Sequence, residues 1–537
     1  MRMVLNAAQM KACDKATIET YGIASLVLQE RAALAVCRHI EAESTEPDLQ
    51  KKLPDRGSVF VYAGVGNNGA DAVACARILS GRGYRPRIFL VGEEARATEE
   101  MRAQLHSAAA CGIPAEAFSK TIESSFPGEV PVCIIDGLFG IGLNRAPEGA
   151  AADAIREINA WKERGVKVVS VDIPSGVNAD DGSVPGEAVR ADCTVTFAFR
   201  KAGQLLYPGA SYCGELYCED IGIPAEALPK ETIPAAFCYQ TAEEAPLPAR
   251  SADGNKGSFG KVLLAAGSET IGGAAILAAK AVLGSGAGMV RVLTARGNRD
   301  ALLTAVPEAL LDIYDNDTTD AALEELCRKA LAWADVLVAG PGIGTGEQAG
   351  KMLHTLLTQA DLPLVLDADA LNLIAAPDSA LPGLLKAYAK KGHPVVLTPH
   401  IGEFCRLYQA VFGKPLSAEE CKANLLRCPK ELSKALGVVL LCKDARSVIA
   451  DAAPDQNGQD KPLFINTSGN DGMATAGSGD VLSGMIGAFL AGGLDAFAAA
   501  CTGAYLHGCA GDLAAKETGK RAMTASDLLS ALPLHDR

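Results

Sequence analysis

Short runs of aliphatic residues alternate with Ala- and Leu-rich stretches along most of the chain. Uninterrupted apolar runs of about four to eight residues are typical of strands that are covered on both faces, as in parallel sheets. The runs in the first half are 59–63, 87–91, 132–136, 167–173 and 194–199. The runs in the second half are 261–266, 289–294, 334–339, 362–367, 394–398, 438–442 and 447–450. The pattern therefore predicts an α/β fold with parallel sheets.

A proline-dense stretch separates the two series of predicted strands. Residues 221–251 show no hydrophobic period. Their prolines are Pro224, Pro229, Pro234, Pro246 and Pro248. Proline density without an apolar period is typical of a linker. We therefore expect the chain of 537 residues to form two domains, 1–222 and 250–537, joined by a linker over 223–249. Each domain is long enough to build its own core.

Composition and charge narrow the class of protein. Asp and Glu number 64 against 50 Lys and Arg, a formal charge of −14. This balance argues against a nucleic-acid binder, which needs a basic face for the phosphates. Hydrophobic residues make up 49% and charged residues 21%, as in folded globular proteins. The 55 glycines gather in short loops between apolar runs, which is typical of α/β enzymes that bind phosphate groups.

Cysteine usage and the chain ends favour the cytoplasm. The 16 cysteines lie in apolar stretches and form no C-x-x-C pair, so we expect reduced side chains that act as small hydrophobes. Residues 1–14 lack the apolar core of a signal peptide. The apolar run 481–494 is 14 residues long, too short to cross a bilayer. We expect a cytoplasmic homo-oligomer that acts on small molecules and has no nucleic-acid or membrane partner.

The first candidate site is a glycine loop between the strand predicted over 59–63 and a predicted helix. Its glycines match G-x-G-x-x-G: Gly64, Gly66 and Gly69. This context is that of a dinucleotide-binding turn. The residues that do not fit that fingerprint are Asn67, Asn68 and Asp71. A carboxylate at Asp71 repels a pyrophosphate, but a carboxylate also stabilises the start of a helix. Both a ligand contact and a helix-start role therefore stay open for Asp71.

Two later loops of the first half carry oxygen-bearing side chains. Asp136 ends one predicted strand, while Asp172 and Ser175 lie at the end of another. Carboxyl ends of parallel strands converge on the crevice where ligands bind. Asn68, Asp136 and Ser175 offer only oxygen donors, which suit a hard cation and not zinc. No His lies near these loops, which argues against Ser-His-Asp hydrolysis.

These segments together resemble the NAD(P)H-hydrate epimerase domain, and the pattern from Met10 to Asp14 is similar to the start of that family. The resemblance implies a Rossmann-like three-layer α/β/α domain with Asp172 at the reacting ring. It implies that potassium is bound by Asn68, Asp136 and Ser175, and Lys201 matches the family's lysine. It also implies substrate contacts by Asn67, Asn68, Gly69, Ala70, Asp71, Gly140, Ile141, Gly142, Leu143, Asn144, Arg145, Ala146 and Asp172.

One departure from that family lies in the first loop. The family usually has Gly-Gly-Asp-Gly where this chain has Gly69, Ala70, Asp71 and Ala72. Two added methyl groups reduce the room for a close approach of backbone and ligand. We therefore expect crowding at this point of the epimerase site.

The strongest local signal is the glycine loop 466–480, which opens a helix predicted over 481–490. Such a loop binds anions through free N–H groups and the positive end of the helix dipole. Asp480 would lie beside a bound anion and donate or accept a proton; the alternative is a carboxylate that only caps the helix. Among the histidines, His400 alone lies in such a loop, so we link it to the substrate. Lys443 follows another predicted strand and offers a cation to phosphates.

This half resembles the ribokinase-like fold and, more closely, the ADP-dependent NAD(P)H-hydrate dehydratases. The matching segments run in family order from Lys256 to Asp480. The resemblance implies substrate contacts by Ala274, Gly342, His400 and Asp480. It implies adenine-nucleotide contacts by Lys443, Asp444, Ala445, Arg446, Ser447 and Gly479. The chain has Asp444 where the family has Gly, Ser447 where it has Thr and Asn255 where it often has His. We expect the extra carboxylate either to weaken nucleotide affinity or to alter which nucleotide is bound.

Both halves thus predict a bifunctional repair enzyme. The N-terminal domain would interconvert the R and S epimers of hydrated NADH or NADPH around Asp172, with K⁺ bound. The C-terminal domain would expel water from the S epimer, with Asp480 as proton carrier, ADP as co-substrate and Mg²⁺. An alternative is an ATP-dependent kinase of the ribokinase type with a non-catalytic dinucleotide-binding domain. A plain dehydrogenase is disfavoured because Asn67, Asn68 and Asp71 spoil the fingerprint.

Overall fold

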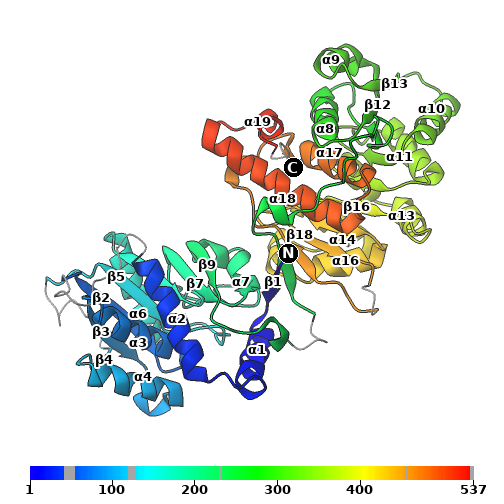
Figure 1. Cartoon of the computed structure of the whole chain (residues 1–537). Coiled ribbons are helices and arrows are strands. Elements are labelled where there is room, and N and C mark those ends of the chain that lie inside the picture. The colour runs from blue at the N-terminus through cyan, green and yellow to red at the C-terminus, as the bar shows by residue number, and fades with distance from the viewer. Residues whose placement is uncertain (42–54, 119–127, 229–232, 455–457, 533–537) are drawn as a thin grey trace. The chain divides into compact units, whose positions relative to one another are not determined.

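The computed structural model describes residues 1–41, 55–118, 128–228, 233–454 and 458–532. It divides into two compact units, residues 3–236 and residues 1–2 with 237–537 (Figure 1). The boundary falls inside the stretch predicted as a linker. That stretch contains β10 (Ala236–Cys238) and two short 3₁₀ turns, Ala225–Ala227 and Ala242–Glu244. Residues 229–232 of the predicted linker, including Pro229, lie outside the described residues.

The N-terminal unit contains a parallel sheet with the strand order β4-β3-β2-β5-β6-β7-β9. The strands are β2 (Ser58–Gly64), β3 (Arg85–Val91), β4 (Ala115–Ala117), β5 (Cys133–Gly137), β6 (Lys167–Val171), β7 (Cys193–Phe197) and β9 (Glu215–Glu219). On one side of β2 lie β3 and then β4, whereas β5, the next strand along the chain, lies on the other side of β2. The loops after β2 and β5 therefore diverge at a switch point, where open α/β sheets bind ligands.

Helices cover both faces of this sheet, which gives the three-layer arrangement. The alternation along β2 assigns its side chains: Val59, Val61 and Ala63 pack with α2 (Ser25–Ile40), α3 (Asn67–Ser80) and α4 (Glu99–Ala110). Phe60 and Tyr62 face the opposite layer, formed by α6 (Ala150–Glu163). Every residue of β2 is buried, which explains its continuous apolar run. Helix α1 (Ala7–Glu19) follows β1 (Arg2–Leu5), which pairs with β8 (Arg200–Lys201).

The sheet of the C-terminal unit has the order β13-β12-β11-β14-β15-β16-β17-β18-β19. The strands are β11 (Lys261–Ala265), β12 (Met289–Ala295), β13 (Leu310–Tyr314), β14 (Val336–Ala339), β15 (Leu364–Leu366), β16 (Val395–Leu397), β17 (Val439–Cys442), β18 (Val448–Asp451) and β19 (Leu463–Ile465). Pairs from β13 to β17 are parallel, whereas β17–β18 and β18–β19 are antiparallel. The prediction of a parallel strand over 447–450 is thus wrong in direction.

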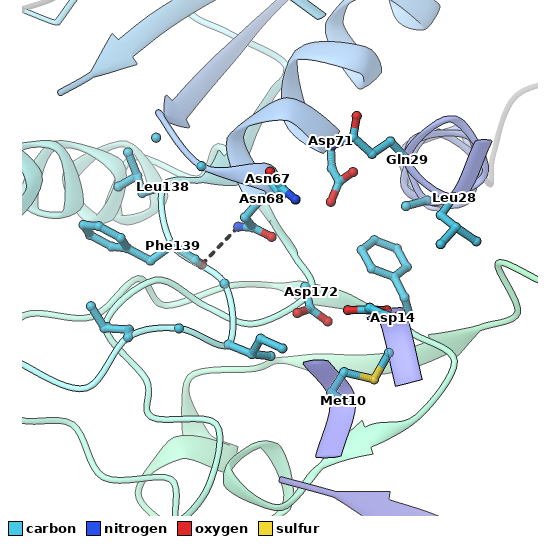
Figure 2. A pocket seen from close by; sticks show the side chains of 18 of the residues that line it. Met10, Asp14, Leu28, Gln29, Asn67, Asn68, Asp71, Leu138, Phe139 and Asp172 are labelled. Atoms are coloured by element: carbon cyan, nitrogen blue, oxygen red, sulfur yellow. Dashed lines mark hydrogen bonds between the residues drawn. The ribbon is translucent and has the colours of Figure 1, made fainter. Parts of the chain in front are cut away.

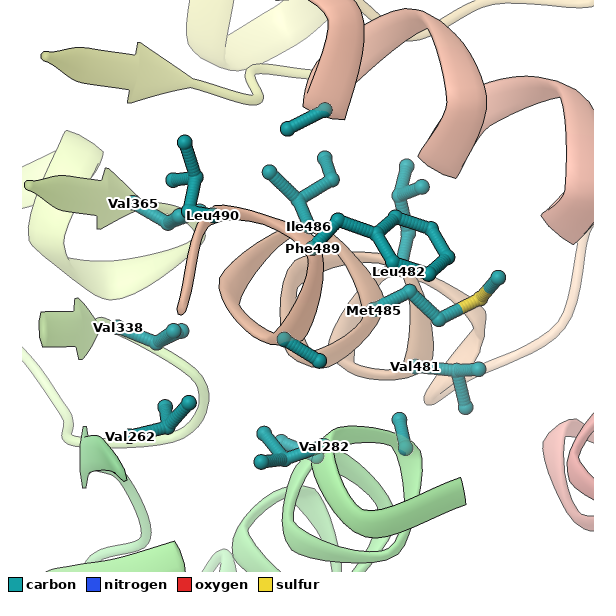
Figure 3. Packing of buried hydrophobic residues seen from close by; sticks show 14 of the residues in the cluster. Val262, Val282, Val338, Val365, Val481, Leu482, Met485, Ile486, Phe489 and Leu490 are labelled. Carbon is teal, nitrogen blue, oxygen red and sulfur yellow. The ribbon is translucent and has the colours of Figure 1, made fainter. Parts of the chain in front are cut away.

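Helix α17 (Ser478–Ala491) is the centre of the C-terminal core (Figure 3). Its residues from Val481 to Leu490 are all buried, as expected of a helix that is apolar on every side. It packs on α8 (Gly272–Gly284) and α18 (Ala496–Thr518), and Gly487 lies against Val338 of β14. The other α-helices of this unit are α9 (Arg299–Ala305), α10 (Asp320–Trp333), α11 (Glu347–Gln359), α12 (Asp369–Ile374), α13 (Leu381–Ala389), α14 (Ile401–Phe412), α15 (Ala418–Ala423), α16 (Cys428–Leu436) and α19 (Ala525–Ser530).

All twelve predicted apolar runs contain a strand, but the structure also has strands that the pattern did not reveal. Strand β9 contains two glutamates and is largely exposed at the edge of its sheet, so it lacks the apolar signature. The predicted strand 194–199 ends earlier, at Phe197, because Ala198 has a positive φ of 57°. In the described ranges, no helix is both long and apolar enough to cross a membrane.

Candidate active sites

A cavity of about 720 Å³ lies at the carboxyl ends of the central strands of the N-terminal unit (Figure 2). Its walls come from the loops after β2 and β5, from α1 and α2, and from Asp172 and Lys201. This is the switch point that the strand order creates. The predicted loops therefore meet at one place although they lie far apart in the sequence.

Most of the substrate contacts implied by the resemblance line this cavity. They are Asn67, Asn68, Asp71, Gly140, Ile141, Gly142, Leu143, Asn144, Arg145 and Asp172. Gly69, Ala70 and Ala146 are not among the lining residues. Gly69 instead permits a close backbone approach, since a Cβ there would lie 1.9 Å from the carbonyl oxygen of Gly64.

The expected crowding by Ala70 and Ala72 is not found in the cavity. Both residues are fully buried in the core formed with α2 and the sheet. The methyl group of Ala72 packs against Gly137, where a Cβ would lie 2.3 Å away. The Ala72 methyl group thus fills space between α3 and β5, and Ala70 is buried in the same core.

Asp71 is a cavity residue and does not begin a helix. Helix α3 begins at Asn67 and has no acidic residue in its first turn, so the helix-start role considered for Asp71 is wrong. Its Oδ1 atom is buried and has no hydrogen-bond partner in the described part of the chain. Burial raises the pKa of Asp71 well above its ordinary value, and the charges of Asp172 and Asp14 raise it further.

Asp172 is held in place by an ion pair. The Lys201 ammonium donates to Asp172 Oδ1 at 2.6 Å, and the Thr196 hydroxyl donates to the same oxygen at 2.9 Å. The Gln204 amide donates to the Asp172 carbonyl at 2.6 Å. Asp172 directly follows β6 with a positive φ of 64°, a strained conformation that is often found at functional sites. Charge-assisted hydrogen bonds of this kind are short and fix the orientation of the carboxyl group.

Sequence reasoning missed Asp14 as a member of this site. Asp14 lies on α1 and lines the same cavity. Burial raises its pKa to about 6; Lys201 opposes that shift, and Asp172 adds to it. A single aspartate within an amphipathic helix has no local signature of function. Only the similarity of residues 10–14 to the start of the family pointed to this helix.

The three residues expected to bind a cation meet beside the cavity. Asp136 is fully buried, and its carboxylate accepts hydrogen bonds from the Ser175 hydroxyl at 2.6 Å, the Ser175 N–H at 2.9 Å and the Ser170 hydroxyl at 2.8 Å. Burial raises the pKa of Asp136, although the hydrogen bonds from Ser175 oppose this shift. A nearby cation would favour the ionised form.

The donor chemistry around Asp136 fits a hard cation of low charge. The Asn68 amide donates to the Phe139 carbonyl at 3.0 Å, and the Ser175 hydroxyl accepts from the Phe139 N–H at 2.9 Å. One carboxylate, one amide oxygen, one hydroxyl and one carbonyl therefore lie in one small region. Such an all-oxygen set with a single charge suits K⁺ better than zinc or another transition metal.

The second site surrounds the start of α17. The helix begins directly after Gly477, which has a positive φ of 88°, and Asp480 lies in its first turn. Burial raises the pKa of Asp480 to about 7, helped by Asp367 and Asp369 and opposed by Lys443. Both protonation states of this carboxyl group are therefore accessible near neutral pH, as proton transfer requires.

Lys443 is paired with a buried carboxylate beside Asp480. Its ammonium donates to Asp367 Oδ1 at 2.7 Å, and the Asp367 side chain is 1% exposed. A Cβ on Gly479 would lie 3.1 Å from Lys443 Nζ, so this glycine leaves the ammonium open toward the helix start. The structure thus brings Lys443, Gly479 and Asp480 together.

His400 and Glu403 form a reciprocal cap at the start of α14. His400 Nδ1 accepts from the Gly402 N–H at 2.9 Å, and the Glu403 carboxylate accepts from the His400 N–H at 2.9 Å. Burial lowers the pKa of His400 and raises that of Glu403 to about 7. A β-bridge joins the backbones of His400 and Lys443, which places His400 next to the start of the loop that follows β17.

The remaining predicted contacts lie at the start of α8, in the turn after β14 and in the loop between β17 and β18. Ala274 and Gly342 touch, since a Cβ on Gly342 would lie 2.9 Å from the methyl group of Ala274. Asp444 lies 3.4 Å from the Lys422 ammonium, so the charge that was expected to weaken nucleotide binding is partly compensated. Arg446 donates to the Thr467 carbonyl at 3.2 Å.

Comparison with known families matches both halves of the chain. The family described as NAD(P)H-hydrate dehydratase matches residues 262–534. The family described as YjeF-related protein N-terminus matches residues 25–203. Among solved structures, an ADP/ATP-dependent NAD(P)H-hydrate dehydratase from Bacillus subtilis is 29% identical, covers 56% of this chain and 97% of its own, and has a TM-score of 0.45.

Curated relatives match along nearly the whole length. The bifunctional NAD(P)H-hydrate repair enzyme of Thermofilum pendens is 34% identical over 536 residues, 99% of this chain and 95% of its own. That of Moorella thermoacetica is 35% identical over 550 residues, 99% of this chain and 96% of its own. That of Escherichia coli is 35% identical over 93% of this chain and 87% of its own. The chain therefore belongs to the family of bifunctional NAD(P)H-hydrate repair enzymes.

Proposed function

We propose that this protein repairs hydrated NADH and NADPH in two steps. The N-terminal unit equilibrates the R and S epimers, and the C-terminal unit removes water from the S epimer with ADP as co-substrate. The observation that carries the proposal is the presence of two separate acid–base sites, around Asp172 and around Asp480, in one chain that matches such enzymes from end to end.

The first site suits a nicotinamide nucleotide. Its volume of about 720 Å³ lies within the range of small-molecule pockets, and α3 begins at its edge, where free N–H groups favour a phosphate. The ion-paired Asp172 would face the reacting ring. Asn68, Asp136 and Ser175 would hold K⁺, whose charge would fix the loop after β5 against α3.

The second site suits an elimination of water. Loss of a hydroxyl group needs a proton for the leaving oxygen, and Asp480, whose pKa is raised to about 7, can supply or accept one near neutral pH. The first turn of α17 would bind an anionic part of the substrate through its N–H groups. Ala274, Gly342 and the neutral His400 would line the space for the nicotinamide moiety.

The loop after β17 would hold the nucleotide. This loop contains Lys443, Asp444, Ala445, Arg446 and Ser447, and Gly479 lies in the first turn of α17. Mg²⁺ would enter with ADP, because it binds mainly through substrate phosphates and one or two carboxylates. The chemistry acts on a diffusible nucleotide, and we propose the cytoplasm as its location and a homo-oligomer as the working form.

A coupled assay tests both activities at once. The full chain is mixed with R and S epimers and ADP, and recovered NADH is followed by absorbance, with the slow spontaneous epimerisation subtracted. Complete conversion requires both activities. A stop near the initial S fraction would leave only the dehydratase, and no NADH at all would contradict the proposal. Replacing ADP by ATP and measuring ADP release separates this function from a kinase.

A further inference from the structure

The cavity of the N-terminal unit contains more ionisable groups than one proton carrier needs. Asp14, Asp71, Asp172 and Lys201 all line it. The Lys201 ammonium donates a 2.6 Å hydrogen bond to Asp172 Oδ1. Asp71 has a buried carboxyl oxygen without any partner among the described residues. Leaving such an atom unsatisfied costs stability, so the unpaired Asp71 needs an explanation in function.

The proposed epimerase reaction requires acid–base help on two faces of one ring. Water adds to a dihydronicotinamide across an enamine double bond, so the hydroxyl is on the carbon next to the ring nitrogen. To invert that carbon, an acid protonates the hydroxyl oxygen, the C–O bond breaks, and the nitrogen lone pair forms a C=N bond. A second water then attacks from the opposite face, the π electrons return to nitrogen, and a base takes the proton of that water.

We propose that Asp71 is a catalytic residue of the epimerase, and that Asp71 and Asp172 exchange the roles of general acid and general base on opposite faces of the substrate ring. Figure 2 shows the two carboxyl groups entering the cavity from different elements, Asp71 from α3 and Asp172 from the turn after β6. The inference rests on the proposed function and adds a second proton carrier to it.

The surroundings of the two carboxyl groups differ. Asp172 accepts hydrogen bonds from Lys201 and Thr196. Asp71 receives none, and burial raises its pKa, as do the charges of Asp172 and Asp14. The titratable groups facing Asp71 are Asp14 on α1, Asp172 after β6 and Cys75 on its own helix. Two carboxyl groups of one cavity, one paired with a lysine and one without a partner, are the arrangement that an acid and a base require.

The cycle closes without any further reagent. One turnover moves a single proton from Asp71 to Asp172, releases one water and consumes another. Turnover in the reverse direction, or exchange of one proton with solvent in the cavity, restores the starting state. Inverting glycosidases use two carboxyl groups on opposite faces of a sugar in a comparable way.

The first test separates proton transfer from binding. In the full-length protein, Asp71→Asn keeps the shape of the side chain but removes its proton. We expect kcat of epimerisation to fall by about 10²- to 10⁴-fold while KM changes by less than about threefold, because only an interaction made in the transition state is lost. A rise in KM with kcat preserved would assign Asp71 to binding alone and would overturn the proposal, as would a rate near that of the wild type.

Controls come from the same chain. Asp153→Asn removes a carboxylate from the outer helix α6 that pairs with Arg156 and should leave epimerisation unchanged. The dehydratase activity of each variant shows that the protein is folded. If the wild-type protein lacks epimerase activity, the proposed function of this unit fails; if the wild type is active and Asp71→Asn is equally active, only the present inference fails.

Two further measurements address the shared mechanism. Because inversion needs both groups, the Asp71→Asn/Asp172→Asn double variant should be at most about threefold slower than the slower single variant, as for groups that act as a unit. Full multiplication of the two losses would contradict shared action. In oxygen-18 water, each inversion should place solvent oxygen in the hydroxyl group; inversion with the original oxygen retained would exclude C–O cleavage and the proposal with it.

Discussion

Three carboxyl groups of this protein, the buried Asp172 and the half-buried Asp71 and Asp480, differ in how their charge is compensated. Asp172 has Lys201 and Thr196 as donors, Asp71 has no partner among the described residues, and Asp480 has Lys443 nearby but also Asp367 and Asp369. Burial penalises the ionised form, whereas opposite charges and hydrogen bonds favour it. The residue type alone therefore does not fix the protonation state; the neighbours do.

Asp480→Asn should lower the rate of dehydration by about 10²- to 10⁴-fold, the usual contribution of a general acid or base. The substitution keeps the shape of the side chain, so the folded structure should be retained. The measurement is the recovery of NADH absorbance from the S epimer with ADP. A near-wild-type rate would remove Asp480 from the mechanism.

The same carboxyl group should make the stability of the C-terminal unit depend on pH. Its pKa is about 7 in the folded protein against an ordinary value of 3.8, so between these values the folded state binds more protons than the unfolded state. Stability then decreases as pH rises through this window. Relative to the wild type, Asp480→Asn should be more stable at pH 8 than at pH 4. Thermal unfolding at both pH values measures this, and equal differences at both would contradict it.

Lys201→Met should destabilise the N-terminal unit by about 3 to 5 kcal/mol, because it leaves Asp172 buried without its cation. The Lys201 side chain is only 1% exposed, so solvent cannot replace the lost charge. The double variant Lys201→Met/Asp172→Asn should regain most of the loss. Urea unfolding of the three proteins tests the expectation, and a single variant as stable as the wild type would show that the ion pair is dispensable.

At the level of elements, both candidate sites use a loop that feeds a helix through glycine. Helix α3 begins directly after Gly66, and α17 begins after Gly477. In each case the first turn presents free N–H groups at the positive end of the helix. In the interior of α17, glycine is required for close packing. A Cβ on Gly484 would lie 2.5 Å from the Ala278 carbonyl oxygen of α8, so the backbones of these two helices are in contact.

Gly484→Ala should therefore destabilise the C-terminal unit by about 1 to 3 kcal/mol through overpacking, although alanine is the better helix former. Gly350→Ala on α11 is the matched control. There the nearest atom, Leu373 Cδ2, would be 3.9 Å from the new Cβ, and a gain of about 0.5 to 1 kcal/mol is expected. Differential scanning calorimetry compares the two; the same sign for both would mean that packing between α8 and α17 does not constrain position 484.

At the level of the whole molecule, each unit has its own hydrophobic core and its own candidate site. Each is thus expected to unfold as a cooperative unit. The formal charge of −14 does not prevent binding of anionic nucleotides, because backbone N–H groups at helix starts attract phosphates without cationic side chains.

Removal of K⁺ should affect one unit. Exchange of K⁺ for tetramethylammonium should lower the transition temperature of the N-terminal unit, since a ligand bound only to the folded state stabilises it. The transition of that unit is identified as the one that Lys201→Met shifts. Epimerisation should slow, with dehydration of the S epimer unchanged. Equal shifts of both transitions would argue against a cation site formed by Asn68, Asp136 and Ser175.

The sequence by itself determined the class of fold and the position of the loops. Continuous apolar runs such as 59–63 mark strands buried on both faces, and glycines after them mark the turns, because these features depend on local periodicity and backbone freedom. The sequence did not reveal the antiparallel direction of β18 or the exposed edge strand β9, since strand direction and edge position depend on neighbours in the sheet.

Only the tertiary structure decided which residues meet at the sites. It brought Asp14, Asp71, Asp172 and Lys201 from four distant segments into one cavity, and it turned the methyl groups of Ala70 and Ala72 into the core. Local sequence specifies the secondary structure on which a side chain is carried. Burial, ion pairing and the resulting pKa shifts arise from residues far apart along the chain, so they became visible only when the strands were placed side by side.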